Sequence, residues 1–193
     1  MKNKCRLSFC MFSIFLIVGS AFSQSTKNLD NNNGFKDFKL GSKYISLYGV
    51  KSKEESGADK VVINYTQEKI GDIPVKTIEL FYLNDALARI VVRVSPENHA
   101  KLLDACKNIF GAPENLSDNK STEENTGVSI PGNNYKDKFL WKGKSLTLEY
   151  FYSYPKISGG ANQVKDLHLQ YSVNDYEDKL KSAKKEKYST SDF

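Results

Sequence analysis

Six segments of the chain alternate apolar and polar side chains with a period of two residues. They lie at residues 61–65, 75–83, 86–94, 139–142, 145–154 and 164–173. Alternation of this kind is typical of strands that bury one face. Antiparallel sheets commonly have one face packed on a core and the other in contact with water. The pattern therefore predicts a largely antiparallel sheet whose apolar face carries residues such as Ile78, Leu80, Ile90, Val92 and Leu169.

A helix is expected before each group of three strands. Ser42 can cap a brief helix that ends at Gly49, and Ser95 and Pro96 begin a helix over 96–110 that stops at Gly111. His99, Leu102, Leu103, Cys106, Ile109 and Phe110 recur at helical spacing within the second helix. The predicted fold class is α+β, a tandem α–β3 repeat with helices on one face of the sheet and the other face open. It forms a single domain over 35–174 that contains a polar loop at 112–137.

The two ends of the chain are expected to lie outside this domain. Lys2, Lys4 and Arg6 precede an apolar run over 7–18, and Ala21-Phe22-Ser23 provides a cleavage site, so residues 1–23 are a predicted secretory signal peptide. An uncleaved anchor is the alternative, but the run is shorter than the roughly 20 residues of a spanning helix. We expect a flexible lead over 24–34, a charged helix and tail over 175–193, and a periplasmic or extracellular location without a membrane span after processing.

Removal of the signal peptide changes the charge and the cysteine content. The net charge falls from +5 to +2 because Lys2, Lys4 and Arg6 are lost, so the basic composition is no indication of nucleic-acid binding. Cys106 is the one cysteine that remains, and we expect it to be a buried apolar side chain.

Sequence motifs for phosphate loops, hydrolase elbows and redox pairs are absent, and His99 and His168 fall on different faces. We therefore expect no cofactor and no metal.

Arg89 and Arg93 are the strongest candidates for a binding site. After residue 23 they are the only arginines of the chain, and their spacing places both on the outward face of one strand, flanking Val91. The predicted binding residues on this face are Arg89, Arg93, Val91, Glu79, Phe81, Phe151 and His168. Arginine and aromatic side chains are enriched at protein interfaces. The alternative is a solvated face on which Arg89 or Arg93 only pairs with Glu79 across strands.

Several short patterns resemble those of a known class of domain. They are F-x-x-F-x-L-G at 35–41, I-x-L-x-Y-x-N-D-x-L-x-x-I at 78–90, F-G-x-P at 110–113 and F-L-W at 139–141. Together they resemble small exported bacterial α–β repeat domains of the beta-lactamase-inhibitory-protein type over residues 35–173. The resemblance implies a fold with a binding face, but it implies neither a target nor a reaction.

The function expected from these features is that of an exported, non-catalytic binding domain. It would bind a macromolecule, expected to be a protein, through the open sheet face and the loop at 112–137, and it would bind no nucleic acid. Two alternatives remain open: an envelope hydrolase that uses Glu79 and Glu149 as a carboxylate pair, and a purely structural envelope component. The alternating aromatic residues at 150–154 also allow a carbohydrate ligand, although Tyr150 and Tyr152 fit better in the core.

Overall fold

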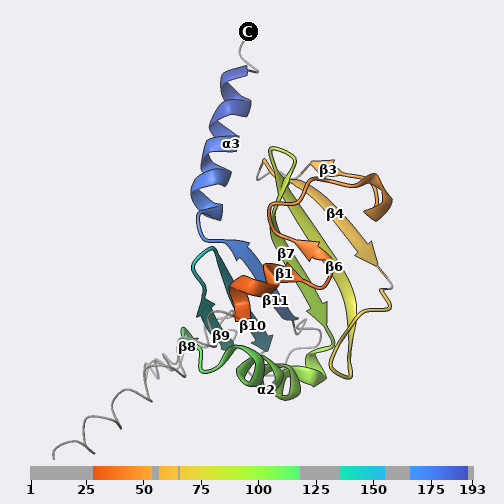
Figure 1. The fold of residues 1–193 in the computed structure, drawn as a ribbon, viewed down its shortest axis with the longest axis vertical. Coiled ribbons are helices and arrows are strands. Elements are labelled where there is room, and N and C mark those ends of the chain that lie inside the picture. The colour runs from red at the N-terminus through yellow and green to blue at the C-terminus, as the bar shows by residue number, and fades with distance from the viewer. Residues whose placement is uncertain (1–27, 54–56, 65, 118–134, 155–165, 191–193) are drawn as a thin grey trace, which may run out of the picture.

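The protein is an α+β domain built on one large antiparallel sheet (Figure 1). The computed structural model describes residues 28–53, 57–64, 66–117, 135–154 and 166–190, so the predicted signal peptide lies outside the described residues. The strands are β1 Gly34–Phe35, β2 Phe38–Lys39, β3 Ser52–Lys53, β4 Asp59–Asn64, β5 Lys69–Ile70, β6 Ile73–Leu83, β7 Ala86–Val94, β8 Glu114–Asn115, β9 Tyr135–Lys142, β10 Leu146–Tyr154 and β11 Asp166–Val173. The helices are η1 Ser46–Tyr48 and η2 Pro96–Asn98, both 3-10, and α2 His99–Phe110 and α3 Tyr176–Thr190.

The sheet consists of two meanders that meet in the middle. Its strand order is β3-β4-β6-β7-β11-β10-β9-β8, with β5 paired to β6, and every pairing is antiparallel. The last strand of the first half, β7, pairs with the last strand of the second half, β11. The predicted fold class and its antiparallel sheet are confirmed. Strands from both halves therefore form one continuous surface.

One face of the sheet carries the hydrophobic core. The inward side chains of the strands are those that the alternation predicted, for example Ile78, Leu80, Ile90, Val92 and Leu169, each at most 1% exposed. α2 packs on this face through Leu102, Cys106 and Phe110. Period-two alternation fixes which side chains share a face, and this is why the core could be assigned from the sequence.

α2 differs in two details from the expected helix. It begins with the 3-10 turn η2, and its buried residues are Leu102, Cys106 and Phe110, whereas Ile109 is 46% exposed. Leu103 is only partly buried, and His99 is exposed and stacks on Tyr152 with a ring-centroid distance of 4.7 Å. Burial raises the pKa of the Cys106 thiol to about 12, as expected for an inert core cysteine.

The expected flexible lead at 24–34 is wrong for the residues that the structure describes. Residues 28–32 are helical, and Leu29 is 1% exposed within the core. The Asp30 carboxylate accepts hydrogen bonds from the backbone amides of Lys144 and Ser145, at 2.8 and 3.0 Å. A Cβ on Gly143 would lie 2.6 Å from Asp30 Oδ1, so a larger residue here would displace the Asp30 carboxylate. These contacts attach the segment to the β9–β10 turn.

The expected helix over 42–49 is also wrong. Lys43 forms a β-bridge with Ala86, and the Leu87 amide donates to the Ser42 carbonyl at 2.8 Å. Only the 3-10 turn η1 remains helical in this segment. Backbone groups that a helix over 42–49 would use for its own hydrogen bonds are thus paired with the start of β7.

α3 corrects the expectation that every helix lies on one face. It begins at Tyr176, and its Tyr176, Leu180 and Ala183 pack with Ala58, Leu83 and Ala88 at the end of the β6–β7 hairpin, on the face opposite the main core. Beyond this contact α3 extends away from the sheet (Figure 1).

The predicted polar loop at 112–137 contains β8 and the first residues of β9, and residues 118–134 lie outside the described part of the chain.

Candidate binding face

The second face of the sheet, here called the polar face, displays three rows of side chains across six strands. The register places β4, β6, β7, β11, β10 and β9 side by side. The first row is Lys60, Phe81, Arg89, Ser172, Thr147 and Lys142; the second is Val62, Glu79, Val91, Gln170, Glu149 and Leu140; the third is Asn64, Thr77, Arg93, His168, Phe151 and Lys138. All seven predicted binding residues lie in these rows, so the structure brings them together on one surface.

Arg93 is the centre of an ion-pair network on this face. Its Nε donates to Glu79 Oε1 at 2.6 Å, and its Nη1 donates to Asp166 Oδ1 at 2.7 Å. Lys60 Nζ lies 3.2 Å from the other Glu79 oxygen. Burial alone would raise the pKa of Glu79, but the hydrogen bonds and charges of Arg93 and Lys60 lower it below its ordinary value. Glu79 is therefore ionised at neutral pH, and the predicted pairing of an arginine with Glu79 occurs at Arg93.

His168 extends the same network toward an aromatic side chain. Its Nδ1 lies 2.9 Å from Asp166 Oδ2, and its ring stacks on Phe151 with a centroid distance of 5.0 Å. Burial lowers the pKa of His168 and outweighs the raising effect of Asp166. A neutral imidazole fits this position, because it stacks on Phe151 without bringing a further positive charge next to Arg93.

Two of the predicted residues are almost completely covered by their neighbours. Val91 is 5% exposed and Glu79 is 9% exposed, although both belong to the polar face. They lie in the middle row, between Arg89 and Phe81 on one side and Arg93 and Thr77 on the other. This corrects their predicted role, since they support the surface rather than form it.

Arg89 has a structural role that the sequence did not indicate. Its Nε donates to Ser172 Oγ at 3.0 Å, its Nη2 donates to Glu177 Oε1 at 2.8 Å, and its guanidinium lies 3.5 Å from the ring centroid of Tyr176. These contacts connect β7, β11 and the first turn of α3. Arg89, one of the predicted binding residues, is therefore already held by contacts within the domain.

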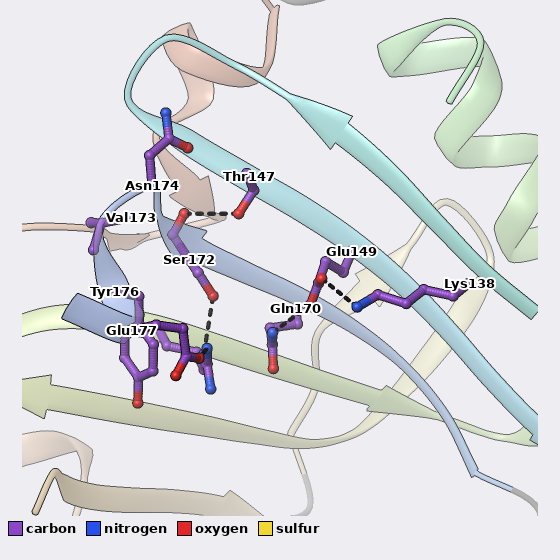
Figure 2. Close-up of a pocket in the computed structure, with 10 residues that line it drawn as sticks. Lys138, Thr147, Glu149, Gln170, Ser172, Val173, Asn174, Tyr176 and Glu177 are labelled. Atoms are coloured by element: carbon purple, nitrogen blue, oxygen red, sulfur yellow. Dashed lines mark hydrogen bonds and ion pairs between the residues drawn. The ribbon is translucent and has the colours of Figure 1, made fainter. Parts of the chain in front are cut away.

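A polar pocket of about 390 Å³ lies between α3 and strands β9 to β11 (Figure 2). Glu149 accepts hydrogen bonds from Lys138 Nζ at 2.8 Å and from Gln170 Nε2 at 2.7 Å on one side of it. Tyr176 and Glu177 lie on the other side, with Ser172 and Thr147 between (Figure 2). Sequence reasoning missed Lys60, Lys138, Tyr176 and Glu177; the phase of β9 could have indicated Lys138, but nothing in the sequence shows that α3 folds back onto β7.

Glu79 and Glu149 do not form a catalytic carboxylate pair. They belong to the same row, but β7 and β11 lie between them, which separates their Cα atoms by about 14 Å at the usual strand spacing. Glycosidases need carboxyl groups about 5–5.5 or 6.5–9.5 Å apart. Each carboxylate is also held by its own cation, Glu79 by Arg93 and Glu149 by Lys138. The geometry thus gives no support to a hydrolase built on these two residues.

Among the side chains of the aromatic run that the structure describes, at 150–153, Phe151 is the one ring on the polar face. Tyr150 is 1% exposed and Tyr152 is 9% exposed within the core, as the alternation predicted. The Tyr150 hydroxyl donates to the His99 carbonyl at 3.1 Å. Phe151 remains half-buried on the polar face, where a single ring is a weak platform for a sugar.

No match was found in comparisons with known protein families, with curated proteins or with solved structures. Within the described ranges, no helix has both the length and the apolar composition needed to cross a membrane. The same part of the chain holds no group of three or more His, Cys, Asp or Glu side chains suited to a metal ion. The polar face must therefore be interpreted from its own chemistry.

Proposed function

We propose that the protein is an exported, non-catalytic domain that binds a protein partner through the polar face. The observation that carries this proposal is that paired charges, half-buried aromatic rings and a polar pocket form one continuous surface. Arg93 and Phe151, which both remain partly exposed on this face, supply the composition enriched at interfaces.

The ion pairs support binding because they hold the side chains in place before a partner arrives. Four cations meet four carboxylates on or beside this face: Lys60, Arg89, Arg93 and Lys138 with Glu79, Glu177, Asp166 and Glu149. Side chains that are already ordered lose less conformational entropy on association. The balance of charge also disfavours a polyanion such as nucleic acid, whose binding depends on unneutralised lysine and arginine.

A photo-crosslinking experiment tests the proposed face. The photoreactive amino acid p-benzoylphenylalanine replaces Phe151 in one variant and the exposed Lys101 of α2 in a control variant. We expect a discrete crosslinked product in cells only from position 151, identified by mass spectrometry. Absence of a product at 151, or the same products from both positions, would contradict the proposal and favour a structural component without a specific partner.

The proposed export makes a separate prediction about the amino terminus. If residues 1–23 are a signal peptide, the mature protein begins at Gln24, since Ala21-Phe22-Ser23 places small residues where the peptidase requires them. Intact-mass measurement of protein isolated from the envelope or the medium is expected to show the loss of residues 1–23. Recovery of the uncleaved chain from a membrane fraction would refute this prediction and favour the anchor.

A further inference from the structure

A second pocket, here called the lysine-rimmed pocket, lies on the core side of the molecule and has no part in the proposed function. Its volume is about 460 Å³, within the usual range for small-molecule sites. It lies between the β1–β2 turn, β5 and α2. Apolar side chains form much of its wall: Phe35, Ile70, Ile109, Phe110, Leu169 and Tyr171.

Tyr171 indicates that this pocket can hold a ligand with a polar atom. The side chain is 5% exposed, yet its hydroxyl forms no hydrogen bond within the part of the chain that the structure describes. Among the described residues, Thr77 Oγ1 is the side-chain polar atom that is both fully enclosed and without a partner. The Tyr171 hydroxyl also has no partner among these residues but is not fully enclosed, so it opens onto the pocket that Tyr171 lines. Burial raises the pKa of Tyr171, which keeps the hydroxyl protonated as a donor. A ligand acceptor in the pocket can therefore accept a hydrogen bond from the Tyr171 hydroxyl.

The rim of the pocket is positively charged. Lys36, Lys39 and Lys69 line it, with Asp37 as the one acidic lining residue. Lys36 lies 3.5 Å from Glu68, and Lys39 donates to the Asn32 carbonyl at 2.9 Å, which uses one of its three N–H groups. Lys69 forms no ion pair or hydrogen bond through its side chain among the described residues. At least two ammonium groups are therefore able to meet an anion at the rim.

We propose that the lysine-rimmed pocket binds a small carboxylate that carries an apolar chain. The apolar wall fits the chain, and the lysines of the rim complement the carboxylate. Ile109 supports this assignment, since a large apolar side chain that is 46% exposed beside the pocket gains burial when an apolar ligand covers it. This inference is independent of the polar face.

Calorimetry with three probes that share a ten-carbon chain, each at a concentration at which it is monomeric in solution, tests the proposal. Decanoate is expected to bind with a stoichiometry of one, decan-1-ol more weakly, and decyltrimethylammonium not at all. Equal binding of the three probes would show that charge has no part in recognition, and absence of decanoate binding would show that the pocket takes no such ligand. Either result would overturn the proposal.

Two variants connect the binding to this pocket. Ile109→Asp adds a carboxylate beside the pocket at a position that is already exposed, and it is expected to weaken decanoate binding by about tenfold or more through like-charge repulsion. Lys69→Met is expected to weaken decanoate binding while leaving decan-1-ol binding unchanged. Leu47→Asp, at an 88% exposed position outside the pocket, is the matched control. If Leu47→Asp weakens binding as much as Ile109→Asp, or if Lys69→Met leaves decanoate binding intact, the site is wrong.

Discussion

Replacement of Leu102 by alanine is expected to lower the free energy of unfolding by about 2–5 kcal/mol. Leu102 is fully buried on the face of α2 that packs against the sheet, beside Cys106 and Phe110. The substitution removes buried apolar atoms and leaves a cavity that the rigid sheet beneath cannot fill completely. Urea denaturation followed by circular dichroism measures the loss.

Ile109→Ala is the matched control within the same helix. Helical spacing places Ile109 on nearly the same stripe as Leu102, but it is 46% exposed. Its replacement is expected to change the free energy of unfolding by about 0.5 kcal/mol or less. A cost for Ile109→Ala equal to that for Leu102→Ala would contradict the packing of α2 described above.

Replacement of Arg93 by methionine is expected to cost about 1–3 kcal/mol of stability at pH 7, the usual penalty for a shielded charged group that loses its partner. Glu79 is 9% exposed and loses the closer of its two cations, while Asp166 loses its hydrogen bond from Nη1. Thermal or urea unfolding at several pH values measures the penalty. Lys142→Met is the control, because the ion pair of Lys142 with Glu114 is exposed to solvent.

The pH dependence of the Arg93→Met penalty has a defined sign. The pKa of Glu79 is lowered in the folded protein, so the ionised Glu79 contributes stability above its ordinary pKa of 4.5, and this contribution is lost as the pH falls through the folded value. Without Arg93, most of the lowering of the Glu79 pKa is lost. The difference between the two proteins is therefore expected to be greatest near neutrality and to shrink below about pH 4.5. A difference that is constant with pH would show that Arg93 acts through packing alone.

The faces of the strands could be predicted from the sequence because alternation is a local property. Ile90 and Val92 are inward and Arg89 and Arg93 outward, as the period of two requires. β7 was expected over 86–94, and its observed bounds are the same. For the same reason all seven candidate residues were placed correctly on one face.

The partners of these residues could not be predicted, because they depend on which strands become neighbours. Asp166 reaches Arg93 only because β11 pairs with β7 rather than with another strand. Asp30 and Lys144 are 114 residues apart, so no local pattern predicts that the N-terminal segment is fixed to the β9–β10 turn. The helix expected at 42–49 failed for a similar reason, since its backbone is paired with the start of β7.

The pairing of β7 with β11 also determines how the chain must assemble. β6 and β7 are joined by Asn84 and Asp85, both with the positive φ of a tight turn, so this hairpin can form early. Arg89 and Ser172, by contrast, are 83 residues apart, and closing a loop of that length costs about 4 kcal/mol of chain entropy. Until the loop closes, the free edge of β7 and the free edge of β11 are both unpaired. At high protein concentration, β7 of one molecule can therefore capture β11 of another, giving an intertwined dimer in which each sheet is completed by exchange.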